Sequence, residues 1–216
     1  MGLFGLGKPN IKDMKNKKDI VGLIKIALGE RKFNVRRKAI VALGELGESA
    51  VEELILILKD KNVPPIVLPN SVDLMTYLKN RSQYEIDRER FLNYFQYKSR
   101  VAWALGAIGD PRAVETLIGA LKGEYVPDGA AHIDEKIWIR GSAARALGKI
   151  RDARAIKPLI QLMTDKNVPL DSVIDALGEI GKPAVKPLVK IMKDKDLAVR
   201  NCAKYVLEEV KKINSI

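Results

Sequence analysis

The chain has 216 residues, 47% of them hydrophobic, which is enough to bury a continuous core. Its longest early apolar run, residues 20–28, is interrupted by Lys25 and is about half as long as a membrane span. The single cysteine, Cys202, excludes an internal disulfide, in agreement with a reducing compartment. Length and composition therefore predict a folded cytoplasmic protein without a membrane-spanning helix.

The net charge of +11 is concentrated at one end of the chain. Residues 1–40 contain 11 Lys and Arg but only 3 Asp and Glu. A basic end favours anionic partners such as nucleic acid, anionic lipid or an acidic protein face, but lysine-rich ends are also commonly just solvated. We favour the solvated interpretation and keep nucleic-acid binding as an alternative.

Residues 1–18 are rich in Gly and Lys and are predicted to form a basic, flexible N-terminal arm, with at most a short helical turn after Asn10. Asp19 is expected to N-cap a first helix, whose apolar residues follow the helical period. Residues 35–46 show the same spacing, so a second helix is expected to pack back on the first. Residues 19–216 are predicted to form a single repeat domain.

The tripeptide Ala-Leu-Gly recurs near the end of four predicted second helices, at residues 42–44, 104–106, 146–148 and 176–178. Most copies are followed by another Gly that suits the left-handed conformation of a helix C-cap. Including the last pair, second helices are expected to begin at residues 97, 139, 170 and 199. Pro158 and Pro187 would then fall in the first turn of two first helices. The pattern predicts an all-α fold, a right-handed α-solenoid of about five antiparallel helix pairs.

The leucine of each Ala-Leu-Gly, together with Leu207 in the last pair, sets the repeat register at residues 43, 105, 147, 177 and 207. The intervals of 62, 42, 30 and 30 residues indicate a unit of about 30 residues with two insertions, at about 62–96 and 123–136. Both insertions fall in the turn between the two helices of a pair. Because such turns align along one edge of a solenoid, we expect the insertions to touch.

Several further features make the chain resemble the HEAT-repeat family. They are the helix ends of the form Ala-Leu-Gly-x-Ile-Gly, the link Gly109-Asp110-Pro111, turns containing Asp60, Asp165 and Asp194, and a basic residue early in the second helices at Arg36, Lys98, Arg140 and Arg200. The closer resemblance is to the short, phycobilisome-lyase-type HEAT-like repeat, over roughly residues 19–213. Leu170 departs from the pattern where a basic residue is expected, and Arg151 departs where the capping Gly is expected.

The resemblance implies several possible roles. Members of the group are scaffolds and adaptors, subunits of bilin lyases, an iron-dependent deoxyhypusine hydroxylase or, more distantly, DNA-repair proteins that grip a duplex on a basic concave face. The hydroxylase needs repeated His-Glu pairs to hold iron, and this chain has one His and no such pair. Fold alone does not decide among the remaining roles.

One row of the second helices is expected to face solvent on the concave surface, because it points away from the buried Ala and Leu positions. In the five pairs this row reads Val41, Trp103, Arg145, Asp175 and Tyr205. A large exposed aromatic side chain beside Arg is typical of a binding surface. We therefore predict partner contacts at Trp103, Arg145 and Tyr205, flanked by Arg37 and Lys149. An equally weighted alternative is that the first insertion covers Trp103.

Other candidate residues have simpler interpretations. The basic residues at positions 36, 98, 140 and 200 suggest an anion-binding ladder, but we expect them to bond Asp side chains of adjacent turns and hold the units in register. The aromatic residues of the first insertion are interpreted mainly as its own small core, with a groove for a protein or a ligand as the alternative. His132 is a conceivable metal ligand, but a single loop His is more often solvated. Trp138 is expected to anchor the second insertion and is included among the predicted partner contacts.

These observations predict a protein-protein interaction scaffold or adaptor that binds a segment of a partner on its concave surface, with no cofactor, metal or catalytic residue. Nucleic-acid binding through the basic end and the concave face is the first alternative, and it requires an affinity that falls steeply with salt. A non-catalytic subunit of a bilin-lyase-like or other enzyme is the second alternative. It would reveal itself by bound colour or by a dedicated partner.

Overall fold

The computed structural model describes residues 10–29, 33–60, 95, 98–125 and 133–215. Its elements are α1 (Ile11–Asn16), α2 (Ile20–Gly29), α3 (Phe33–Leu46), α4 (Glu48–Lys59), a helix at residues 98–108, η1 (Pro111–Ala113), α7 (Val114–Lys122), α8 (Ile133–Ile150), η2 (Ala153–Ala155), α9 (Ile156–Gln161), α10 (Leu170–Ile180), α11 (Lys182–Ile191) and α12 (Leu197–Asn214). No β-strand occurs in these ranges.

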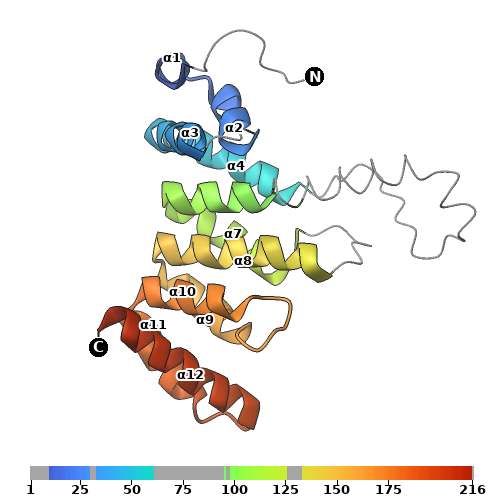
Figure 1. The fold of residues 1–216 in the computed structure, drawn as a ribbon, viewed down its shortest axis with the longest axis vertical. Coiled ribbons are helices and arrows are strands. Elements are labelled where there is room, and N and C mark those ends of the chain that lie inside the picture. Colours follow the sequence, from blue (N-terminus) through green and yellow to red (C-terminus); the bar gives the residue numbers. More distant parts are fainter. Residues whose placement is uncertain (1–9, 30–32, 61–94, 96–97, 126–132, 216) are drawn as a thin grey trace, which may run out of the picture.

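The helices form pairs, and the pairs stack one on the next along the long axis of the molecule (Figure 1). The pairs are α2 with α3, α4 with helix 98–108, α7 with α8, α9 with α10, and α11 with α12. Second helices pack on second helices, as α10 does between α8 and α12, and first helices pack on first helices, as α9 does on α11. The chain is therefore an α-solenoid, as the repeat pattern predicts.

Part of the predicted N-terminal arm is a packed helix. Helix α1 contacts α2 and α3, and its apolar residues Ile11 and Met14 pack against the core. The Asn10 side chain accepts a hydrogen bond of 3.2 Å from the Asp13 amide, which satisfies a free donor of the first turn. The i, i+3 spacing of the two apolar residues then gives the short helix a face to bury. Residues 1–9 of the predicted arm lie outside the described residues.

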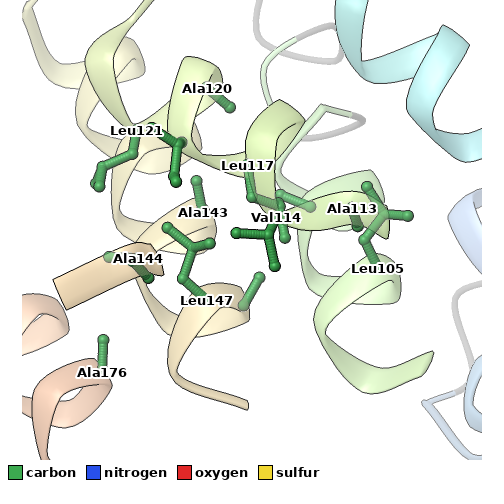
Figure 2. Packing of buried hydrophobic residues seen from close by; sticks show 14 of the residues in the cluster. Leu105, Ala113, Val114, Leu117, Ala120, Leu121, Ala143, Ala144, Leu147 and Ala176 are labelled. Atoms are coloured by element: carbon green, nitrogen blue, oxygen red, sulfur yellow. The ribbon is translucent and has the colours of Figure 1, made fainter. Parts of the chain in front are cut away.

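The leucines of the repeated tripeptide form the central line of the core. Leu43, Leu105, Leu147 and Leu177 are fully buried, and Leu207 is buried at the matching place in the last pair. Figure 2 shows how Leu105, Leu117 and Leu147 lie among alanines of neighbouring helices. Alternating large and small side chains let adjacent pairs interdigitate at the density of a protein interior. The register derived from the leucines is thus confirmed.

The glycine of the tripeptide has a packing role that the sequence pattern does not reveal. A Cβ added to Gly106 would lie 2.5 Å from the Ala146 Cα, and one added to Gly148 would lie 2.6 Å from the Ala176 Cα. Both contacts are with backbone, which cannot swing aside as a side chain can. Each Gly therefore lets the next second helix approach to the distance of a bare backbone.

The second glycine of the motif has the predicted capping conformation. Gly47, Gly109 and Gly181 have φ values of 69°, 79° and 77°, in the left-handed region. Arg151, which stands where a Gly was expected, adopts the same conformation with φ of 59°. A side chain there costs roughly 1–2 kcal/mol relative to Gly, so the geometry of this turn is imposed by its surroundings.

Several helix boundaries differ from the predicted ones. Helix α8 begins at Ile133 rather than at residue 139, so it extends into the region assigned to the second insertion. Helix α11 begins at Lys182, directly after the positive-φ Gly181, and Pro183 lies in its first turn. Pro187 consequently lies inside the helix, which corrects its predicted place in the first turn. Most of the two predicted insertions, and hence their expected contact, lie outside the described residues.

Candidate functional site

The basic residues near the start of the second helices bond mainly to helix ends. The Lys98 Nζ donates to the carbonyls of Ile57, Leu58 and Asp60 at the end of α4. The Arg140 Nε donates to the Leu121 carbonyl at 2.7 Å, in the last turn of α7. These acceptors have no partner within their own helix, which is why a buried cation from the paired helix satisfies them.

The predicted bond to an Asp side chain is confirmed for Arg140. Its second nitrogen lies 2.7 Å from the Asp165 Oδ2 in the turn of the next pair. Arg200 instead donates to the backbone carbonyls of Asp194 and Lys195 at 2.8 and 3.0 Å. The side chain of Arg36 lies outside the described residues. We conclude that Lys98, Arg140 and Arg200 serve the fold and do not form an anion-binding ladder.

Two residues of these contacts, Lys98 and Asp165, have a lowered pKa. Burial lowers the pKa of Lys98 to about 8, against the opposing charge of Asp60. The Lys98 side chain belongs to a residue that is only 2% exposed. At Asp165, burial alone would raise the pKa, but hydrogen bonds from the Asn167 amide and from Arg140 outweigh it and lower the pKa.

A second connection between the pairs was not foreseen from the sequence. Asp110 and Asp152 each cap a 3₁₀ turn by accepting from the amide two residues on, and each also binds the side chain of that residue, Arg112 or Arg154. The Arg112 Nη1 also lies 2.5 Å from the Glu48 Oε1 of the preceding pair. The signal was available in the sequence as Asp-Pro-Arg-Ala at 110–113 and Asp-Ala-Arg-Ala at 152–155.

The first groove on the second-helix face lies between α3 and helix 98–108, and we call it the Trp103 groove. It has a volume of about 550 Å³ and is lined by Arg37, Ile40, Val41, Gly44, Glu45, Trp103, Ala107 and Ile108. Gly44 shows why the groove exists, because a Cβ added there would meet only the Ile108 side chain, at 3.8 Å or more. The backbones of α3 and helix 98–108 therefore do not approach each other at Gly44 as closely as the backbones of helix 98–108 and α8 do at Gly106.

Trp103 forms one wall of this groove and is half-buried, with part of its ring packed against the core. The Lys149 Nζ, which comes from α8 in the next pair, lies 5.4 Å from the centre of the indole ring. A cation at this distance is attracted to the ring face and helps to hold its orientation. The structure thus brings together three predicted contact residues, Arg37, Trp103 and Lys149.

The second groove on this face lies where α8 meets helix 98–108 and the start of α10, and we call it the Trp138 groove. It has a volume of about 530 Å³ and is lined by Ser99, Arg100, Ile137, Trp138, Gly141, Ser142, Arg145, Pro169 and Ser172. Trp138 is 43% exposed. The groove therefore unites the predicted residues Trp138 and Arg145, which lie about two helical turns apart on α8.

Two hydroxyls in the Trp138 groove have no hydrogen-bond partner in the described part of the chain. The Oγ atoms of Ser99 and Ser172 are buried and find no acceptor or donor among the described residues. Ser172 as a whole is only 1% exposed. Helix α10 begins beside it without a side-chain cap, so free amides are available at the same place. A buried hydroxyl without a partner is rare, and it marks a place where a polar group of a ligand would be stabilised.

The remaining predicted contact residue lies apart from both grooves. Tyr205 on α12 is 50% exposed and lines neither of them. Arg145 does not stand alone, since its Nε lies 3.5 Å from the Asp175 carboxylate of the next pair, and both side chains are more than half exposed. The residues predicted to form one row therefore lie in two separate grooves, except for Tyr205, which lies apart from both.

Metal binding, thiol chemistry and membrane crossing have little support in the described part of the chain. No group of three or more His, Cys, Asp or Glu side chains is placed there to hold a metal ion, and His132 lies outside it. Burial raises the pKa of the Cys202 thiol, which disfavours the reactive thiolate at neutral pH. None of the helices searched has both the length and the apolar character that a bilayer crossing requires.

Comparison with known proteins gives two family matches. The model of HEAT repeats matches residues 96–172, and the model of the PBS lyase HEAT-like repeat matches residues 35–60. No curated protein matches the chain. Among solved structures, the complex of CpcE and CpcF of phycocyanin lyase from Nostoc sp. PCC7120 is similar, with 20% identity and a TM-score of 0.47 over 98% of this chain and 69% of the other. An engineered protein is also similar, with 22% identity and a TM-score of 0.34 over 94% and 83% of the two chains.

The residues matched by the two family models include the main contacts between consecutive helix pairs. The matched ranges contain three of the four Ala-Leu-Gly copies, including the two whose glycines contact the next second helix. They also contain both Asp-x-Arg turns that connect consecutive pairs. Two parts of this stack of helix pairs thus match models of HEAT repeats.

Proposed function

We propose that the protein is a binding module rather than an enzyme, and that its second-helix face receives a segment of a protein partner. HEAT-repeat proteins are in general scaffolds for protein interactions, which supports the coarse assignment. The observation that carries the finer proposal is the presence of two grooves on this face, each with an aromatic wall and basic residues. Tryptophan and arginine are the residues most enriched at the energetic centres of protein interfaces.

The two grooves suit different parts of such a segment. The Trp103 groove has an apolar lining of Ile40, Val41 and Ile108, which suits a hydrophobic side chain. The Trp138 groove offers the Ser172 hydroxyl, the uncapped start of α10 and the Arg145 guanidinium, which suit a carbonyl or carboxylate oxygen. We propose that the bound segment presents an apolar anchor to the first groove and an oxygen acceptor to the second.

Charge on this face disfavours nucleic acid. Glu45 lies in the Trp103 groove together with Arg37, and Asp175 pairs with Arg145 beside the Trp138 groove. Affinity for nucleic acid depends mainly on uncompensated Lys and Arg along the phosphate backbone. Neither family match points to nucleic acid. A role as a non-catalytic subunit of an enzyme would use the same surface, with the enzyme's other subunit as the partner.

The test begins with peptides selected on the wild-type protein from a random library, followed by affinity measurements on variants. For Trp103→Ala combined with Arg145→Ala we expect a loss of about 2 kcal/mol or more, roughly 30-fold in Kd. The matched control is Leu56→Ala combined with Lys59→Ala on the first helix α4, which removes an exposed apolar and a basic side chain outside both grooves. Equal binding by both double variants would refute the proposed surface.

Ser172→Ala gives a separate test of the Trp138 groove. The hydroxyl contributes no hydrogen bond to another described residue, so its removal should leave folding intact. If the hydroxyl serves a bound acceptor, the same change should weaken the selected peptides by about 1 kcal/mol. Unchanged peptide affinity in Ser172→Ala would remove this hydroxyl from the proposed site.

A further inference from the structure

The other face of the solenoid, built from first helices, carries a groove of a different kind. It lies between α9 and α11 and has a volume of about 810 Å³. Its lining consists of Lys157, Ile160, Gln161, Lys186, Pro187, Val189, Lys190, Ile191 and Lys193, and we call it the lysine groove. The last helix pair is inclined against the preceding ones, as Figure 1 shows for α12.

The floor of the lysine groove is apolar and partly open to solvent. Ile160 is buried, Ile191 is half-buried, and Val189 is 44% exposed. These three side chains come from both helices, and we call them the apolar strip of the groove. Apolar strips of this kind mark places where another surface docks.

The rim of the groove is uniformly basic. Lys157 on α9 and Lys186, Lys190 and Lys193 on or beside α11 are all exposed, and no lining residue is acidic. None of the four forms an ion pair in the described part of the chain. Asp194, which follows Lys193, instead accepts a hydrogen bond from the Asp196 amide at 2.9 Å. The positive charge of this rim is therefore uncompensated.

We propose that the lysine groove binds an acidic amphipathic helix of a protein partner. A helix laid between α9 and α11 places apolar residues at i, i+3, i+4 and i+7 on the strip and carboxylates on its flanks opposite the lysines. Complementary charge of this kind speeds association and selects the partner. The hollow shape favours a helix over a flat anionic lipid surface, and the apolar floor offers nothing to a phosphate backbone.

The test uses a fluorescent peptide of about 16 residues with Leu at those four positions and Glu on the flanks, and fluorescence anisotropy as the readout. For Lys186→Glu combined with Lys190→Glu we expect at least a tenfold higher Kd. The matched control, Lys204→Glu combined with Lys211→Glu on α12, makes the same change of charge outside the groove and should bind within about twofold of wild type. Circular dichroism melting of both variants establishes that each is folded.

Further outcomes decide between this occupant and others. A peptide of the same composition with its Leu positions scrambled should bind at least tenfold more weakly, and equal binding would overturn the proposal because charge alone would then suffice. Val189→Asp should weaken the original peptide without changing the affinity of peptides selected for the second-helix face. Binding to anionic vesicles with no binding to the helical peptide would also overturn the proposal. Because these variants lie outside the Trp103 and Trp138 grooves, their failure leaves the proposed function untouched.

Discussion

The central steps of the solenoid differ from its terminal steps in how closely successive second helices approach. In the centre, Gly106 and Gly148 each face the backbone of an alanine in the next helix. At the first step, Gly44 faces only the side chain of Ile108, and at the last step Gly178 faces the side chain of Ile213. We call the steps at Gly106 and Gly148 tight seams, and the step at Gly44, where an added Cβ would have room, an open seam. At Gly178 an added Cβ would lie 2.7 Å from the Ile213 Cδ1, so the last step is also close, but the contact is with a side chain and not with backbone.

The two terminal steps are also where two of the three grooves lie. The Trp103 groove occupies the first step, and the lysine groove occupies the last step on the opposite face. In the last pair, Val206 stands where the other pairs have the small Ala of the tripeptide, which leaves no room for a close backbone contact. Backbone contacts at the central tripeptide glycines thus coincide with grooves at the two terminal steps.

The largest effect should come from adding one methyl group at the tight seam. Gly106→Ala places a Cβ 2.5 Å from the Ala146 Cα, so the helices must separate, at a cost of about 1–3 kcal/mol or more. Gly44→Ala, at the open seam, has room for the methyl group and should gain up to about 1 kcal/mol from helix propensity. Urea unfolding of both variants measures the difference. Equal effects would mean that the two seams are not distinct.

The next largest effect should come from the buried cation that spans a central step. Arg140→Met removes the hydrogen bond to the Leu121 carbonyl and the ion pair with Asp165, leaving both acceptors partly buried, and should cost about 2–3 kcal/mol. Arg200→Met, at the terminal pair, removes bonds to exposed carbonyls and should cost no more than about 1 kcal/mol. A larger loss at position 200 than at 140 would contradict the comparison.

A smaller effect of opposite sign is expected at the seam between α8 and α10. Ser172→Ala removes a buried hydroxyl that has no partner among the described residues, and should stabilise the unbound protein by about 1 kcal/mol. Ser142→Ala in the same groove changes a half-buried hydroxyl and should be close to neutral. Thermal unfolding compares the two, and destabilisation by Ser172→Ala would show that its hydroxyl is satisfied in solution.

The last expected effect is a pH dependence at Lys98, the counterpart of Arg140 one pair earlier. Its folded pKa of about 8 lies below the value of about 10.4 for an unfolded chain. Between these values the unfolded chain binds more protons, so stability rises with pH across this window. The stability difference between wild type and Lys98→Met, measured by urea unfolding from pH 7 to 10, should therefore shift in favour of the wild type. A difference that stays constant would place the Lys98 pKa near its ordinary value.

The features that follow a strict residue period were predictable from the sequence. The leucine register, the capping glycines and the N-cap at Asp19, whose carboxylate accepts from the Gly22 amide at 2.9 Å, all depend on local spacing. The function of Gly106 was not predictable, because a glycine near a helix end is equally expected from capping. Its role depends on Ala146, which lies 40 residues away and approaches only in the folded stack.

The candidate site was predictable as a set of residues but not as a shape. The residue spacing placed Trp103 and Arg145 on one row of the second helices, yet the two side chains line different grooves. The position of a groove depends on how far apart neighbouring helices lie, and not only on the direction of one side chain. The lysine groove escaped prediction for the same reason. Its residues come from two first helices that are about 30 residues apart, and each helix on its own has an ordinary amphipathic pattern.

The Asp-x-Arg turns affect how such a protein can change in length. In each turn the Asp forms an ion pair with the Arg two residues on. This Arg also forms an ion pair with an acidic residue at the start of the preceding first helix, Glu48 or Glu115. The unit from η1 to α8 carries both halves of this connection, since its Arg112 binds the preceding pair and its Glu115 is bound by the next. A second copy of this unit inserted beside the first would therefore find a matching partner on each side.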